Sequence, residues 1–416
     1  MTFKSTLDAV RRAVAGAAGQ VSTRLAPSRL DFPPIWSRGS AAGVVVTPQS
    51  AMGLTAVYCA INRISGDFAV ITPELREFLP RGGTRLVEDH PSFLILNRRP
   101  DPTLPGSNAL RFRRAQMAQV LGWGNSYAEI LRDGHGYPVA MRFLPVNTQP
   151  GHNDSGAVIY RVPGRDKPIP AANVFHFAGL SRDGLLGLSP LDQCIEAIAI
   201  GLASQTYASS YYATGGTPEL VFKHKTTNDD EQIDDFLKRF RARRCEGNKF
   251  HEPIVLPPDW DMDRLTVNPD VAQLIATRSF QVAEVARMFN MPPNKLQDLS
   301  SAHFANVEQS DLDYYKGTMT PWFAAWEAEA DDKLLLAGEF ETRSFTHNLD
   351  RYTRGDTAAR TDRAVKYVAA GILSVDEVRE EDGYAPLGPE KGGDKHLAPL
   401  NSTTLEHLGD PAPPAA

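Results

Sequence analysis

Two long amphipathic segments stand out in the pattern of apolar and polar residues, and both lie in the second half of the chain. The first is expected to begin at Asn268, a good N-cap residue, with Pro269 at the first helical position. It ends before Pro292 and Pro293, because a proline disfavours helical geometry in the residue that precedes it. At 1.5 Å per residue, this pattern predicts a helical rod of roughly 34 Å.

The second segment begins at Asn306, and Gln309 follows three residues later as in a capping box. Its apolar residues recur at spacings of three and four, which predicts one buried helical face. They are Leu312, Tyr315, Met319, Trp322 and Trp326. Pro321 lies within this helix, where it removes a backbone hydrogen bond and clashes with the carbonyl four residues back, at a cost of about 3 kcal/mol. We therefore expect a kink near Gly317 to Pro321.

A polar segment connects the two helices over residues 294–305. Its central residues are Leu296, Gln297, Asp298, Leu299, Ser300, Ser301, Ala302, His303 and Phe304. Because the polar side chains are costly to bury without partners, we expect a mobile loop held between two fixed helix ends. Lys295 at its edge carries the one permanent positive charge of this segment.

The residues before these helices predict an α+β domain. Residues 1–50 are rich in Ala, Gly, Ser and Pro, which is typical of a poorly packed arm. From Leu54 onward, helical spacing and strand patterns predict an antiparallel or mixed sheet with helices. The expected helices lie near 54–68, 93–96 and 112–121, and the expected strands at 73–79, 126–132, 140–144, 158–162 and 174–177.

A further helix is expected from Ser189 towards Tyr212, ended by Gly215 and Gly216. A small excursion separates it from the first long helix. We expect a strand at 220–223, a charged helix over 229–244, and strands near 254–256 and 265–267. After the second long helix, the alternation over 339–349 predicts a strand that returns to the sheet of the first domain. Short helices over 357–370 and 374–382 precede a tail that we expect to be disordered from Gly388.

The composition narrows the class of protein. A chain of 416 residues has room for two or three domains. Its 42% hydrophobic and 23% charged residues are ordinary for a soluble protein, and no apolar stretch approaches the roughly 18 residues of a membrane span. A net charge of −6 argues against a protein whose main task is to grip the phosphate backbone. Cys59, Cys194 and Cys245 are far apart, which argues against a thiolate metal site or a disulfide framework.

Sequence motifs for catalysis do not occur in the chain. There is no GxxxxGK[ST] pattern, so the phosphate cradle of a P-loop ATPase is absent. Candidate GxSxG elbows fail at the second glycine, and HExxH does not occur. His176 lies between Phe175 and Phe177 on a predicted strand, which is typical of a structural histidine. We predict no enzyme activity, no catalytic residue, no metal site and no cofactor.

Two charged clusters lie on the predicted helix 229–244. The acidic residues at its start complement the helix dipole, although a two-metal nuclease uses the same residue types; they are Asp229, Asp230, Glu231, Asp234 and Asp235. The basic residues at its far end are Lys238, Arg239, Arg241, Arg243 and Arg244. These also suit the dipole, and the functional alternative is a contact strip for DNA or a neighbouring subunit. Trp322, Phe323 and Trp326 could stack on bases, but their helical spacing is more typical of a core.

The run Val282–Leu296, together with Gln297–Ser301 and Asn306–Gln309, resembles the stem, channel loop and long helix of tailed-phage portal proteins. The resemblance is to the small-portal branch of this family, which is found in siphophages, prophages and gene transfer agents. Further matches follow one another along nearly the whole chain. They are TAVYCAI at 55–61, HPSFLILN at 90–97, GNSYAEI at 124–130, VFHFAGL at 174–180, GLLGLSP at 184–190 and GILSVDEVR at 371–379.

The resemblance implies an α+β portal fold with an α+β wing, a helical stem, a small α/β clip, a long kinked helix and a helical crown. The implied parts are a flexible arm (1–50), the wing (51–188, with a return strand at 338–350), the first stem helix (189–216), the clip (217–267), the second stem helix (268–293), the channel loop (294–305), the long wing helix (306–337), the crown (351–387) and the disordered tail (388–416). The basic strip would then lie in the clip, and the loop around Ser300 would face the channel.

The resemblance also implies a function. The chain would form a ring, dodecameric as in the family, at one capsid vertex, and double-stranded DNA would be packaged and ejected through its axis. The implied partners are the major capsid protein, the terminase large subunit and a head-tail adaptor protein, with no membrane. The implied location is the virion, and the host cytoplasm during assembly. Two other classes stay open: a metal-dependent DNA-processing enzyme of a mobile element, with metal on the Asp229 to Asp235 cluster, and a monomeric binding module.

Overall fold

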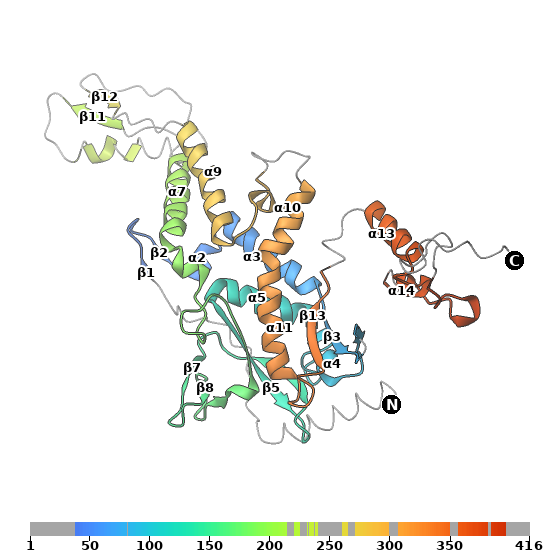
Figure 1. The fold of residues 1–416 in the computed structure, drawn as a ribbon. Coiled ribbons are helices and arrows are strands. Elements are labelled where there is room, and N and C mark those ends of the chain that lie inside the picture. The colour runs from blue at the N-terminus through green and yellow to red at the C-terminus, as the bar shows by residue number, and fades with distance from the viewer. Residues whose placement is uncertain are drawn as a thin grey trace. The chain divides into compact units, whose positions relative to one another are not determined.

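The computed structural model describes residues 38–80, 82–213, 220–224, 231, 233–236, 238–239, 260–264, 271–298, 307–349, 357–381 and 384–396. The chain separates into two compact units, Met1–Asn348 and Leu349–Ala416. Both mix short loops with regular elements, and the first unit combines helices with antiparallel sheets, as the sequence predicts for an α+β protein (Figure 1).

The described helices of the first unit are α2 (Pro48–Ala51), α3 (Thr55–Val70), α4 (Pro91–Asn97), α5 (Ala109–Trp123), α6 (Pro190–Gln193), α7 (Ile195–Ala213), α9 (Val271–Met288), α10 (Val307–Asp313) and α11 (Thr320–Leu334). Its described strands are β1 (Arg38–Gly39), β2 (Val45–Val46), β3 (Pro73–Phe78), β4 (Thr84–Leu86), β5 (Asn125–Arg132), β6 (Pro138–Phe143), β7 (Gln149–His152), β8 (Val158–Arg161), β9 (Ile169–Pro170), β10 (Val174–Ala178), β11 (Leu220–His224), β12 (Trp260–Arg264) and β13 (Arg343–His347).

Two three-stranded antiparallel sheets, β10-β5-β6 and β13-β3-β4, form the body of the first unit with α3, α5 and α11. The predicted return strand is confirmed, because β13 pairs with β3 and Phe345 lies opposite Leu75. Stacked rings join the layers: Phe68 of α3 lies 5.6 Å from Phe177 of β10 and 5.1 Å from Phe323 of α11, between ring centroids. These rings are fully buried, and they tie segments far apart in sequence into one core.

Helix α11 covers the outer edges of both sheets with carboxylates. Glu329 accepts a hydrogen bond from the backbone N–H of His176 on β10 at 2.9 Å, and Asp331 accepts one from Phe345 on β13 at 2.7 Å. Glu327 likewise accepts from the backbone N–H of His347 at 2.5 Å. An uncovered edge strand leaves N–H donors open to pairing with another chain. The helix therefore closes these two edges, at the cost of partly burying three carboxylates.

An arginine holds three helices of the same body together. Arg113 of α5 is 3% exposed and donates to the carbonyl of Ala69 at the end of α3 and to that of Leu96 at the end of α4. The last carbonyls of a helix have no partner within the helix and carry its negative dipole end. Arg113 on α5 therefore binds the C-terminal carbonyls of both α3 and α4, and it stabilises the packing of these three helices. Burial lowers the pKa of Arg113 to about 10.

Residues 38–50 are not part of a poorly packed arm, which corrects the predicted boundary. Strands β1 and β2 pair, and Thr47 forms a capping box with Ser50 at the start of α2. Val46 and Ala51 are fully buried. The structured region therefore begins by Arg38, and the remainder of the predicted arm, residues 1–37, lies outside the described residues.

The single helix predicted from Ser189 is divided in two. Ser189 caps α6 by accepting a hydrogen bond from the N–H of Asp192, as expected for this residue type. Cys194 then leaves helical geometry, with φ −108° and ψ 29°, and α7 begins at Ile195. Strand β11 matches its prediction, but it pairs with β12, which the pattern of residues did not predict. The strands expected near 254–256 and 265–267 lie outside the described residues.

The second unit contains α13 (Thr357–Ala369) and α14 (Val375–Glu381), close to the predicted bounds. Asp376 of α14 accepts hydrogen bonds from the N–H groups of Leu387 and Gly388, and its own N–H donates to the carbonyl of Gly393. This packing contradicts disorder from Gly388 onward, because a buried carboxylate fixes residues on both sides of that position. The described part of the tail ends at residue 396.

Candidate functional site

The C-terminal end of α9 forms a complete Schellman motif. The N–H of Met291 donates to the carbonyl of Ala286 at 2.9 Å, and that of Asn290 donates to Arg287 at 3.1 Å. Asn290 takes the left-handed conformation at φ 50°, which asparagine tolerates better than most residues. Met291 and Ala286, the two positions whose apolar contact often accompanies this motif, are both buried. Pro292 and Pro293 then prevent continuation, as predicted.

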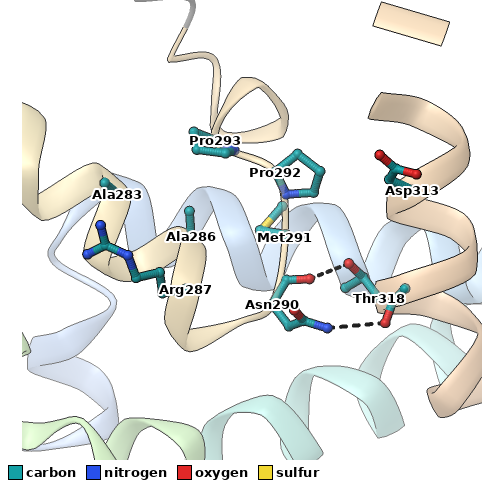
Figure 2. A pocket seen from close by; sticks show the side chains of 10 residues that line it. Ala283, Ala286, Arg287, Asn290, Met291, Pro292, Pro293, Asp313 and Thr318 are labelled. Atoms are coloured by element: carbon teal, nitrogen blue, oxygen red, sulfur yellow. Dashed lines mark hydrogen bonds between the residues drawn. The ribbon is translucent and has the colours of Figure 1, made fainter. Parts of the chain in front are cut away.

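Asn290 also joins α9 to the second long helix (Figure 2). Its side-chain Nδ2 donates to the carbonyl of Gly317 at 3.1 Å, and its own backbone carbonyl accepts a hydrogen bond from the hydroxyl of Thr318. Residues Tyr314–Met319 form a π-helical turn between α10 and α11. Within it, the N–H of Thr320 reaches back five residues to Tyr315. One residue at a helix end thus contacts two adjacent residues of a locally widened helix.

Pro321 explains why Gly317 accepts a bond from outside its own helix. Proline has no N–H, so an α-helix cannot satisfy the carbonyl four residues before it, which here is Gly317. The Asn290 amide takes that place. A π-helical turn is an established cause of a helix kink, and this turn lies directly before the proline. The predicted bend at Pro321 therefore has a structural basis, although its angle and role stay a prediction.

An open groove of about 350 Å³ lies at this junction, between the end of α9 and the π-helical turn. Ala283, Ala286 and Met291 contribute apolar surface from the α9 side, and Thr318 lies on the side of the second long helix (Figure 2). Gly317 also lines the groove. Arg287 lies at the rim, where it forms an ion pair with Glu284. The Asn290 contacts bridge the two helices beside this groove and so contribute to how the helix ends meet.

The two ends of the predicted channel loop are fastened to each other. The 3-10 helix Pro293–Leu296 precedes the loop, and Asn294 donates to the hydroxyl of Ser310 on α10 at 2.8 Å. Lys295 forms an ion pair with Asp311, and its ammonium lies 5.3 Å from the centre of the Tyr314 ring. The described residues that flank 299–306 are therefore bonded to each other across that segment.

Two expectations for this loop need correction. Leu296 was predicted to belong to the mobile part, but its side chain is 8% exposed and packs as part of the anchor. Lys295 was expected to be the one permanent positive charge at the edge of the loop, but its side chain is only 10% exposed and is neutralised by Asp311. Its long apolar stem follows the buried surface beside Tyr314, which a sequence pattern does not reveal. Gln297 and Asp298 are described, and Gln297 is left-handed at φ 63°.

The rest of the predicted loop, Leu299, Ser300, Ser301, Ala302, His303 and Phe304, lies outside the described residues. Of the predicted basic strip, Lys238 and Arg239 are described, helical and exposed. Arg239 forms an ion pair with Asp235 at 2.5 Å, four residues earlier on the same helix. Arg241, Arg243 and Arg244 lie outside the described residues. The structure therefore does not bring the loop and the strip together within the described ranges.

The loop anchor connects to the first domain through Tyr314. This buried tyrosine donates to the carboxylate of Asp67 at 3.0 Å, and Arg63 bonds the same oxygen at 2.7 Å. Both partners lie on α3. Burial raises the pKa of the Tyr314 hydroxyl, so it stays a donor at neutral pH. Sequence analysis missed Tyr314 and Asn290, although an asparagine directly before Met-Pro-Pro is a signal for a left-handed helix cap.

The aromatic and histidine predictions agree with the structure. Phe323 and Trp326 are 2% and 0% exposed and belong to the core, while Trp322 is partly buried against Phe177. His176 is buried, with Nδ1 bonded to the hydroxyl of Tyr160 at 3.0 Å and Nε2 to Oδ1 of Asn125 at 2.9 Å. Burial, with the nearby charge of Lys333, lowers the pKa of His176 to about 4. It is a neutral structural residue at physiological pH.

In the part of the chain that the structure describes, no group of three or more His, Cys, Asp or Glu side chains is arranged to hold a metal ion. None of the helices found there has the length and apolar character needed to cross a membrane.

Comparisons with known proteins identify the family. The sequence model for the phage portal protein family matches residues 55–383. A probable portal protein of Streptomyces phage phiC31 is 26% identical over 391 residues, covering 89% of this chain and 83% of the relative. The crystal structure of an HK97 family phage portal protein from Corynebacterium diphtheriae shares the fold, with TM-score 0.55 and 16% identity over 77% of this chain and 99% of that one. A chain in the neck of a native gene transfer agent particle, computed with C12 symmetry, aligns with TM-score 0.54 and 18% identity over 85% and 96%. The chain belongs to the phage portal protein family.

Proposed function

We propose that this protein forms a closed ring at one vertex of a phage or gene transfer agent capsid, and that double-stranded DNA enters and leaves through the ring axis. The observation that carries the proposal is the family match, which extends from α3 to the end of the second unit's helices. The C12 symmetry of the similar neck structure supports a ring of twelve copies. Heterologous contacts between identical copies generate such cycles.

The helix pair α7 and α9 is the proposed stem. These helices pack against each other, and between them the chain makes the excursion that contains β11 and β12 (Figure 1). Residues 217–267 would form the clip, and the second unit the crown. The α+β body of α3, α5 and α11 with its two sheets would form the wing. In this arrangement the Asn290 junction joins the stem to the long wing helix.

The loop after Asp298 is proposed to face the channel and to touch DNA without holding it. The neutralised state of Lys295 supports weak contact, because each phosphate that a protein neutralises strengthens static binding at low salt. A channel through which DNA slides requires such weak contact. Ser300→Arg with Ser301→Arg should leave rings intact and slow packaging or change DNA retention. Loss of rings by a variant whose subunits still fold would instead make this loop a subunit interface.

The partners proposed from the family are the major capsid protein, the terminase large subunit and a head-tail adaptor protein. The exposed Lys238 and Arg239 suit a contact strip in the clip for one of these partners or for DNA. Charge reversal of the strip should weaken that single contact and leave ring formation unchanged. A ring lost on charge reversal would assign the strip to the contact between copies.

Members of the portal family are structural proteins, and we propose that this chain acts without catalysis, first in the host cytoplasm and then in the particle. Two experiments test the function. Cryo-electron microscopy of particles carrying a tagged chain should locate the tag at one vertex only, and a tag distributed over many vertices would contradict the proposal. Purified protein incubated with DNA should leave it uncut with and without divalent metal. Metal-dependent cleavage would favour the DNA-processing alternative.

A further inference from the structure

The loop between β10 and α6, residues 179–188, is held in one shape by many hydrogen bonds. Asp183 Oδ1 accepts from the hydroxyl of Ser181 at 2.9 Å and from the N–H groups of Leu185 and Leu186 at 2.9 and 2.8 Å. At the base, Asn125 donates to the carbonyl of Gly187 and accepts from its N–H, both at 2.8 Å. The loop is therefore a rigid projection and not a loose connection.

This projection presents two leucines to solvent. Leu180 is 77% exposed and Leu186 is 46% exposed. They flank Asp183, whose pKa is lowered to about 2 by the hydrogen bonds from Leu186, Leu185 and Ser181, so this carboxylate is always charged. A pre-organised loop with exposed large apolar side chains is typical of a binding element, because little entropy is lost when it docks.

A concave surface of matching chemistry lies on another part of the chain. Helices α3 and α5 border an open groove of about 280 Å³. Ile61, Ala115 and Ala118 give it an apolar floor, and Tyr58, 54% exposed, stands at its rim. Arg111 and Arg114 line the same groove and are exposed. It therefore offers apolar contact for leucines and positive charge for a carboxylate between them.

We propose that the Leu180 loop of one copy docks into the α3–α5 groove of the next copy in the ring. Leu180 and Leu186 would lie on the apolar floor, and the Asp183 carboxylate would face Arg111 and Arg114. The projection and the groove are different surfaces of the same chain, so their contact is heterologous and repeats from copy to copy until a cycle closes. This inference rests on the proposed ring function, and it names the surfaces that would make the ring.

The first test uses two variants that each lose one surface. Leu180→Ser with Leu186→Ser removes the apolar projection, and Arg111→Glu with Arg114→Glu makes the groove repel Asp183. Each buried leucine should contribute roughly 10- to 100-fold in affinity, so either variant should remain monomeric at concentrations where the parent forms rings. Leu104→Ser, at another exposed leucine (51% exposed), is the matched control and should form rings normally.

Mixing the two variants distinguishes this contact from any other. The leucine variant retains only the groove, and the arginine variant retains only the projection. A copy of one can therefore pair once with a copy of the other, and mass photometry should show dimers and no rings. Rings formed by either variant alone, or by the mixture, would overturn the inference while leaving the ring function intact. If the parent itself formed no ring, the proposed function would fail instead.

Cross-linking gives an independent readout in assembled rings. In a variant with its three native cysteines replaced by serine, Leu180→Cys and Tyr58→Cys should join neighbouring copies through a short bis-maleimide into a ladder of multimers. The control pair combines Leu180→Cys with Val70→Cys, which is 53% exposed at the opposite end of α3, and should give no ladder. Equal ladders from both pairs, or none from the first pair, would contradict docking in this groove.

Discussion

Asn290 contributes to the stability of the end of α9 in two ways, and substitutions can separate them. Asn290 combines a left-handed backbone with a side-chain bond to Gly317. Asn290→Gly keeps the backbone freedom and removes the side-chain bond, which contributes about 0.5–1.5 kcal/mol. Asn290→Ala removes the bond and also forces an alanine into the left-handed region, at a further cost of about 1–2 kcal/mol. The alanine variant should therefore lose about 1.5–3.5 kcal/mol in total.

The assay is hydrogen exchange at the N–H of Met291, which closes the cap on α9. Since 1.4 kcal/mol corresponds to tenfold, the protection factor should fall about 2- to 10-fold for glycine and about 10- to 300-fold for alanine. Protein concentration must be the same throughout, because ring formation itself stabilises the folded state. Gln297→Gly is the control at the second left-handed position and should not lower protection. Equal losses for glycine and alanine would refute the backbone contribution, and no loss for glycine would refute the side-chain bond.

Three further predictions follow from single residues. Pro321→Ala restores an N–H for the carbonyl that Asn290 now binds, so the helix should straighten in the variant's ring structure; an unchanged bend would show that packing sets the angle. Burial raises the pKa of Glu329 from 4.5 to about 7, so its ionisation should cost up to about 3 kcal/mol of stability as pH rises through that window. Because the buried His176 adds the opposite trend to both proteins, the difference in thermal stability between the parent and Glu329→Gln should shrink by that amount between pH 5 and 8, and parallel pH profiles would refute this. Gly124→Ala would place Cβ 2.5 Å from the carbonyl oxygen of Gly187 and should abolish soluble expression. Gly156→Ala has a similar positive φ but open space around it, so it should cost only about 1–2 kcal/mol of stability. Equal expression of the two variants would contradict the steric argument.

The local signals predicted most of the α+β body of the first unit. Proline pairs, N-cap residues and alternating patterns act over a few residues, so the end of α9, the start of α6 and strands β3, β5, β6, β8 and β10 lie close to their predicted positions. The return of β13 to β3 was also expected, because its apolar alternation requires a sheet and the first domain provides the edge.

The second long helix shows why the rest was not predictable. The spacing of apolar residues in a regular α-helix predicted that Leu312 and Trp322 lie on its buried face. In the structure, Tyr314 and Phe323 are the side chains at the centre of the core. The π-helical turn adds residues to one turn of the helix and shifts the phase of the face. The carbonyl of Gly317 in that turn accepts a hydrogen bond from Asn290, which lies 27 residues away in sequence. A pattern read along one helix contains no information about such a partner.

The partners of the charged groups were not predictable for a related reason. Lys295 stood out in the sequence only as the one positive charge at the edge of a polar loop, whereas in the fold Asp311 and the Tyr314 ring, from the other side of that loop, enclose it. Nothing in the sequence indicated that the three carboxylates of α11 accept hydrogen bonds from the edges of two sheets. In each case the partner belongs to an element that only the tertiary fold brings close.

The central claim is that identical copies of this chain close into a ring around a DNA-sized hole. Negative-stain electron microscopy of the purified protein, with its mass measured in the same sample, tests this most directly. The account predicts one high-order species, seen end-on as a ring with an axial hole and with twelve-fold symmetry as in the similar neck structure. A monomer or simple dimer under all assembly conditions, including co-expression with capsid and scaffold proteins, would contradict it.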